Sequence, residues 1–190
     1  MHQDKLKKSR FWIIPATLIL AAAFSRLLPH PYNFSPVAAM ALLGGAVMKD
    51  KKLAFLLPLG ALLLSDLCFS LFTSTSGFYG FSQLINYAAF ALIVGLGMLL
   101  IKKIKLRNVV VASLSASVLF FLLSNFGVWA VAGGVAPYTA DGAGLLNTYV
   151  LGIPFLGNTL IGDLCYSGVL FGAYALIRHY TYKPQQAIAG

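Results

Sequence analysis

The sequence predicts an all-α membrane protein, a bundle of six transmembrane helices with both termini in the cytoplasm. Hydrophobic residues make up 59% of the 190 residues, whereas charged residues make up 10% and glutamate does not occur. Apolar stretches recur at close to the length of about 20 residues that a helix needs to cross a bilayer. Lysine and arginine are confined almost entirely to alternate gaps between these stretches.

One transmembrane domain is expected at residues 11–178, between a basic tail at 1–10 and a second cytoplasmic tail at 179–190. The second span is the shortest, because a His-Pro-Tyr-Asn run precedes it and Gly44-Gly45 lies inside it. The six expected spans run from Phe11 to Leu28, Phe34 to Met48, Leu53 to Phe72, Ser82 to Ile101, Val109 to Ala132 and Val150 to Ile177.

The formal net charge of +9 would suggest a nucleic-acid partner in a soluble protein, but the positions of the cations explain it by topology. Thirteen of the fourteen lysines and arginines lie before the first span, after the second, after the fourth or after the sixth. The positive-inside rule places these segments in the cytoplasm, so no nucleic-acid partner is expected. A cleaved secretory signal at the N-terminus, which would leave five spans, is the alternative interpretation of the first stretch.

Two aspartates stand in near-identical settings inside apolar stretches. The twelve residues from Leu59, LGALLLSDLCFS, align with LGNTLIGDLCYS from Leu156 with seven identities, which places Asp66 and Asp163 at equivalent positions. Two three-span halves in series have opposite topologies, and ligand sites in such inverted repeats lie at the junction of the halves. A chance match among apolar residues, or a buried salt bridge that holds helices together, is the alternative.

Polar side chains concentrate in the outer halves of the expected spans. Charged and amide groups in hydrocarbon cost on the order of a few kcal/mol each unless they are paired or line a watery space. The pattern therefore predicts a polar cavity that faces outward, with Arg26 available to neutralise one aspartate. The candidate binding residues are Arg26, His30, Asn33, Asp66, Gln83, Asn86, Tyr87, Asn125, Asn158 and Asp163.

Four motifs carry a family resemblance: PHPYNFSPVAAMALLGGA from Pro29, PLGALLLSD from Pro58, FFLLSNFGVW from Phe120 and GIPFLGNTLIGD from Gly152. They resemble an uncharacterised family of small bacterial inner-membrane proteins. That family in turn resembles the S components, the substrate-binding subunits of energy-coupling factor vitamin transporters. The resemblance implies a multi-pass protein of the bacterial inner membrane that captures a vitamin-like molecule near the outer face, beneath the loops after spans one, three and five.

The same resemblance implies partners, a transmembrane coupling protein and two ATPases. S components dock on these partners through small residues in the first helix, often alanines four apart. This sequence departs from that pattern, since its nearest small pairs are Ala21 with Ser25 and Ala41 with Gly45. Small residues at this spacing also serve ordinary helix packing.

Two other transport classes remain as alternatives. One is a small proton- or ion-coupled carrier, in which a buried carboxylate acts as a relay. The other is a solitary cobalamin-type transporter, although the loop at 73–81 lacks the cysteine ligand that such a protein would use. No H-E-x-x-H, G-x-S-x-G or P-loop motif occurs, so neither an enzyme, a cofactor nor a metal site is expected. The loop at 133–149 is the expected lid of the cavity.

Overall fold

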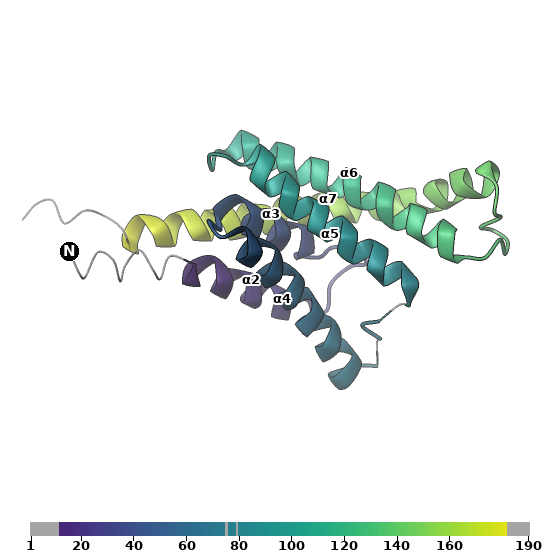
Figure 1. Cartoon of the computed structure of the whole chain (residues 1–190), viewed down its shortest axis with the longest axis horizontal. Coiled ribbons are helices and arrows are strands. Elements are labelled where there is room, and N and C mark those ends of the chain that lie inside the picture. The colour runs from purple at the N-terminus through teal and green to yellow at the C-terminus, as the bar shows by residue number, and fades with distance from the viewer. Residues whose placement is uncertain (1–11, 75, 79, 182–190) are drawn as a thin grey trace, which may run out of the picture.

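The computed structural model describes residues 12–74, 76–78 and 80–181, and this part of the chain contains six helices and no strand (Figure 1). Four of the helices are long and apolar enough to cross a membrane, which indicates a membrane protein and confirms the all-α prediction. The helices are α2 (Ile13–Ser25), α3 (Val37–Val47), α4 (Lys51–Phe72), α5 (Phe81–Leu100), α6 (Leu106–Val131) and α7 (Gly142–Thr181).

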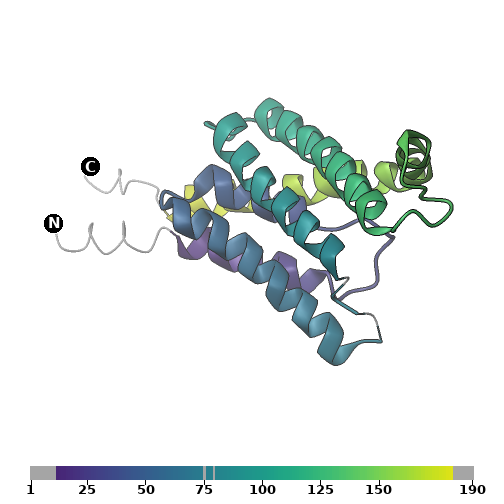
Figure 2. The same ribbon diagram turned by 45° about the vertical axis from the view of Figure 1, so that its right-hand side comes forward.

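Successive helices run in opposite directions along the bundle, so the loops gather at two ends (Figures 1 and 2). One end, the basic end, holds the loops at 48–50 and 101–105 and the points where the described chain begins and ends. The opposite end, the loop end, holds the loops at 26–36, 73–80 and 132–141. The α6–α7 hairpin extends past the other helices at the loop end.

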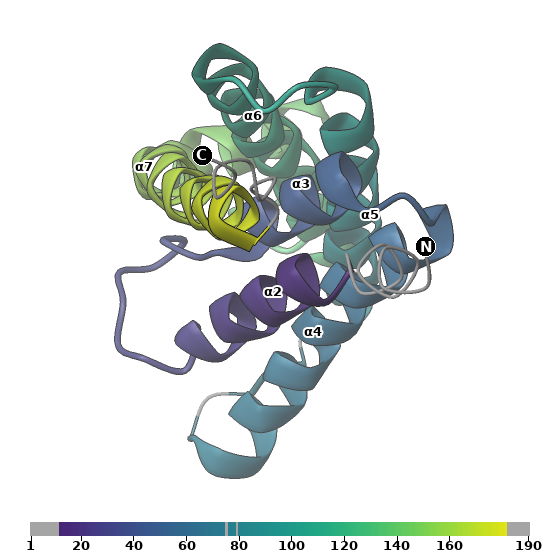
Figure 3. The ribbon, with the colours of Figure 1, turned by 90° about the vertical axis from the view of Figure 1, so that its left-hand side faces the viewer.

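Helix α3 is the centre of the bundle and packs against each of the other five described helices (Figure 3). Its residues from Val37 to Gly45 are all buried. A Cβ at Gly45 would overlap the backbone of Val94, and a Cβ at Gly97 would approach the Leu42 carbonyl oxygen to 2.5 Å. The Ala41–Gly45 pair therefore serves internal packing of α3 against α5 and is not an exposed docking surface.

Two of the expected spans form shorter helices than their apolar stretches. The 13 residues of α2 and the 11 of α3 correspond to about 20 and 16 Å at 1.5 Å per residue, below the roughly 30 Å of a bilayer core. Pro29 and Pro31 follow α2, and Pro36 directly precedes α3, so the chain between them is held outside a helix. The described helices of spanning length therefore number four.

Helix α7 is longer than predicted, with 40 residues, and begins eight residues before Val150. The prediction of a loop over 133–149 is therefore wrong in its second half. The Asp-Gly-Ala-Gly run resembles a turn, but Asp141 stabilises the first turn of α7 by accepting the N–H of Gly144 at 2.7 Å. The Thr139 hydroxyl donates to the same oxygen at 2.7 Å, and these two hydrogen bonds hold the pKa of Asp141 below its usual range.

Candidate functional site

The candidate site is a pair of adjoining cavities beyond the first turn of α3. The main cavity has a volume of about 710 Å³, and the side cavity, between α6 and α7, has about 310 Å³. They share Asn33, Asn86, Phe120 and Thr159 in their walls. Val37 and Ala38 line the main cavity. The late start of α3 thus leaves the space that the cavity occupies.

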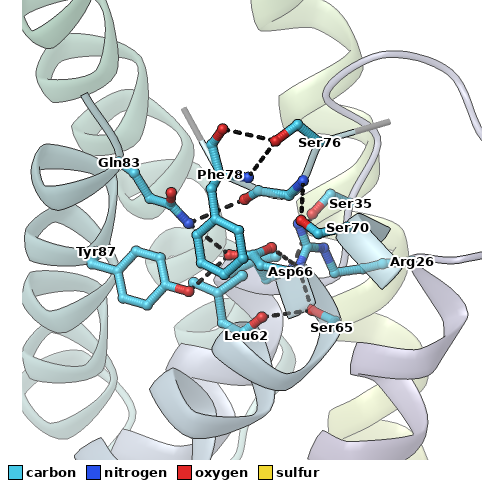
Figure 4. Close-up of polar contacts among 12 residues, drawn as sticks. Arg26, Ser35, Leu62, Ser65, Asp66, Ser70, Ser76, Phe78, Gln83 and Tyr87 are labelled. Atoms are coloured by element: carbon cyan, nitrogen blue, oxygen red, sulfur yellow. Dashed lines mark hydrogen bonds and ion pairs between the residues drawn. The ribbon is translucent and has the colours of Figure 1, made fainter. Parts of the chain in front are cut away.

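A charged cluster, the Asp66 cluster, is made of Arg26, Ser65, Asp66, Gln83 and Tyr87, and all of its members except Ser65 line the main cavity (Figure 4). Arg26 directly follows α2 and donates to Asp66 Oδ1 at 2.7 Å and to the Ser65 hydroxyl. Asp66 Oδ2 accepts from the Tyr87 hydroxyl at 2.7 Å and from Gln83 Nε2 at 3.2 Å. The prediction that Arg26 pairs with an aspartate is confirmed.

The loop between α4 and α5 folds onto this cluster (Figure 4). The Gly77 carbonyl accepts from Gln83 Nε2 at 3.1 Å, and the Gly77 N–H donates to Ser70 Oγ at 3.0 Å. A Cβ at Gly77 would overlap the backbone of Asp66, so only glycine permits this approach. The loop thereby covers the backbone beside the ion pair.

Asp163 lies apart from the Arg26–Asp66 pair and is bonded by serine. The Ser117 hydroxyl of α6 donates to Asp163 Oδ2 at 2.6 Å. Ser117 is the twelfth residue of the 26-residue α6, so Asp163 contacts α6 near its middle. Ser117 is not among the predicted binding residues, so this contact was not predicted. The one sequence signal for this contact was the spacing of Ser113 and Ser117, which are four residues apart and therefore lie on one face of the helix.

The loop at 26–36 lies on one face of α7, over three residues at four-residue spacing. Asn158 Nδ2 donates to the Tyr32 carbonyl at 3.0 Å. A Cβ at Gly162 would lie 3.0 Å from Cα of Phe34. The rings of Phe34 and Tyr166 are 5.6 Å apart, centroid to centroid. This loop, rather than the one after α6, makes the broader cover of the main cavity.

The predicted site residues are largely brought together. Six line the main cavity only: Arg26, His30, Asp66, Gln83, Tyr87 and Asp163. Asn33 and Asn86 line both cavities, and Asn125 lines the side cavity. Asn158 lines neither and instead holds the loop at 26–36. The prediction that Asn158 is a binding residue of the cavity is therefore corrected.

His30 and Asn33 belong to the covering loop. The ring nitrogens of His30 lie 3.0 Å from the Pro31 carbonyl and 3.2 Å from the Arg26 carbonyl, so the side chain orders the loop. Asn33 has φ of 61°, in the left-handed region that asparagine tolerates better than most residues. Thr148 and Thr159 also line the side cavity and were not predicted, because threonines on apolar helices carry no distinctive pattern.

A helical bundle with spanning apolar helices and a polar cavity defines a membrane protein with a candidate small-molecule site. Residues 6–186 match the family of unknown function DUF6580, and the chain belongs to that family. Comparison with curated proteins and with solved structures found no match.

Proposed function

We propose that this protein is a membrane-embedded substrate-binding protein, similar to an S component, that captures a small vitamin-like molecule in the main cavity. The observation that supports this function is the convergence of charged and amide side chains from three helices, α4, α5 and α7, and from the loop at 26–36 on one cavity. Its volume of about 710 Å³ lies within the range of roughly 300–1,000 Å³ typical of small-molecule pockets.

Two amide side chains are available to a ligand. The side chains of Asn33 and Asn86 have no hydrogen-bond partner among residues 12–74, 76–78 and 80–181. Both line the main cavity and the side cavity. An amide offers two donors and an acceptor, so these residues can orient a polar ligand that extends from one cavity into the other.

The proposed orientation places the loop end outside the cell and the basic end in the cytoplasm, with six membrane passages in total. The lysines of the loops at 48–50 and 101–105, and those that begin α4, lie at the basic end, as the positive-inside rule requires. Cysteines at Ser76 and Asp141, introduced after Cys68 and Cys165 are replaced by serine, test it. Labelling by an impermeant thiol reagent only after permeabilisation would reverse the orientation.

Binding is tested by mass spectrometry of small molecules that co-purify with the protein in lipid nanodiscs. Asn86→Trp places an indole in both cavities and should abolish the captured species. Leu84→Trp lies on the same helix, 64% exposed, and should leave capture unchanged. Equal capture by both variants would place the bound molecule elsewhere and refute the proposal.

Delivery of the ligand across the membrane is proposed to need a coupling protein with ATPases or a slow reorientation of the bundle. A second candidate function, an ion-coupled carrier, draws support from the serines that continue from Asp163. The Ser117 Oγ that faces Asp163 also lies 3.0 Å from the Ser113 carbonyl oxygen, and the Ser113 hydroxyl donates to Ser167 Oγ at 2.7 Å. Accumulation of ligand in liposomes that follows an imposed proton or sodium gradient, and stops with an ionophore, would favour the carrier.

A further inference from the structure

The charges that line the main cavity are unequally paired. Arg26 and Asp66 neutralise one another at 2.7 Å. Asp163 also lines the cavity, and no lysine, arginine or histidine of the described segments lies within salt-bridge distance of it. His30 is exposed and directs both ring nitrogens at backbone carbonyls of its own loop. Asp163 is therefore the acidic group of this cavity without a cation.

The hydrogen bonds of Asp163 leave one oxygen for a ligand. Ser117 donates to Oδ2, and no donor within the described segments reaches Oδ1. Across the same segments, no fully enclosed side-chain oxygen or nitrogen lacks a partner. Oδ1 is therefore reached from the cavity, although the residue as a whole is only 4% exposed.

We propose that the ligand of the main cavity carries a positively charged amine and that Asp163 is the residue that binds it. This inference rests on the proposed binding function and adds the chemical class of the ligand. An amine beside Oδ1 forms a charge-assisted hydrogen bond, which is about twice as strong as a neutral one. It also compensates a carboxylate that is otherwise buried without a counter-charge.

The walls indicate an organic amine rather than a bare metal ion. No group of three His, Cys, Asp or Glu side chains that could hold a metal occurs in the described part of the chain. The cavity is far larger than an ion, and Phe90 and Phe120 form a stacked pair in its wall with ring centroids 5.0 Å apart. Aromatic faces attract organic cations, and a cavity lined by both aromatic rings and a carboxylate suits an amine on an apolar frame.

The test uses three protonated amines, each with the alcohol that is its uncharged isostere: benzylamine with benzyl alcohol, 2-phenylethylamine with 2-phenylethanol, and cyclohexylamine with cyclohexanol. Thermal shift and calorimetric titration of the purified full chain are expected to show binding of at least one cation at least tenfold tighter than its isostere. Asp163→Asn keeps the shape of the side chain and should weaken the binding of that cation at least tenfold.

The matched control is Asp50→Asn, the same chemical change at the basic end. Asp50 is the N-cap of α4, and asparagine caps helices equally well, so cation binding should stay within twofold. The comparison of cation with isostere in the unaltered protein needs no variant, so it still decides whether the ligand carries a positive charge if Asp163→Asn fails to fold.

Isosteres that bind as tightly as the cations would overturn the amine assignment while leaving the proposed binding function intact. If Asp163→Asn binds the cation as tightly as the unaltered protein does, Asp163 is not the residue that binds the amine. If none of the probes binds and no molecule co-purifies, both the amine assignment and the proposed function fall.

Discussion

Substitutions of Arg26 and Asp66 should have strongly coupled effects on the free energy of unfolding, because the two side chains form a buried pair. The exposed fraction is 13% for the Arg26 side chain and 4% for that of Asp66. Removing one member of a buried pair costs about 3–5 kcal/mol. We expect about 3 kcal/mol for Arg26→Met, the lower end of that range, because Asp66 keeps its bonds from Tyr87 and Gln83 and borders a cavity. Asp66→Asn should cost about 2–3 kcal/mol.

The double variant separates pairing from other effects. It should lose about 2 kcal/mol less than the sum of the single changes, since neither side chain is then left with an unpaired buried charge. The assay is unfolding by sodium dodecyl sulfate in mixed micelles, followed by tryptophan fluorescence. Arg107→Met, at an exposed arginine, should change the free energy of unfolding by less than about 0.5 kcal/mol. Additive single changes, or single changes no larger than that of Arg107→Met, would refute the coupling.

Further perturbations address the loops and the helix α7. Gly77→Ala should destabilise the protein by about 1–3 kcal/mol in the same unfolding assay, because its Cβ overlaps the α4 backbone. The Cβ of Gly162→Ala would push against the loop at 26–36, so this variant should weaken ligand binding. Gly157→Ala, with open space around its Cβ, should stabilise α7 by up to about 1 kcal/mol. Ligand binding that Gly157→Ala weakens more than Gly162→Ala does would contradict the packing. The lowered pKa of Asp141 means that its ionised carboxylate stabilises the start of α7 above the ordinary pKa of about 4 and loses this effect as pH falls through the lower folded value. Amide exchange at Gly144, corrected for its intrinsic pH dependence, should accelerate only below about pH 4, and acceleration already near pH 6 would argue against the cap.

The long helices were predictable from apolar length alone. The predicted spans Leu53–Phe72, Ser82–Ile101 and Val109–Ala132 differ from α4, α5 and α6 by at most three residues at either end. Transfer of the backbone into hydrocarbon requires such stretches to be helical, so composition suffices. The predicted span Phe34–Met48 comes equally close to α3, but the central position of α3, packed against the other five described helices, does not follow from apolar length.

The contacts of the candidate site also differ in how far the sequence predicts them. Pairing of Arg26 with an aspartate follows from the cost of isolated charge in an apolar bundle, and few charges were available to choose from. The hydrogen bond from Ser117 to Asp163 could not be predicted from the sequence, because serines occur on several helices and the free-energy cost of burying a hydroxyl is too small to indicate its partner. The role of Asn158 depends on the path of a loop, which local residue patterns do not specify.

The shortness of α3 has an electrical consequence if the bundle spans a membrane as proposed. Water that fills the main cavity brings the outside potential down to the first turn of α3, at Val37. The voltage then falls mainly across the packed half of the bundle, about 16 Å deep at α3. A full crossing is worth about 2.3 kcal/mol per elementary charge at 100 mV. A cation entering the cavity from the loop end traverses little of that drop, whereas its passage beyond α3 would carry nearly all of it.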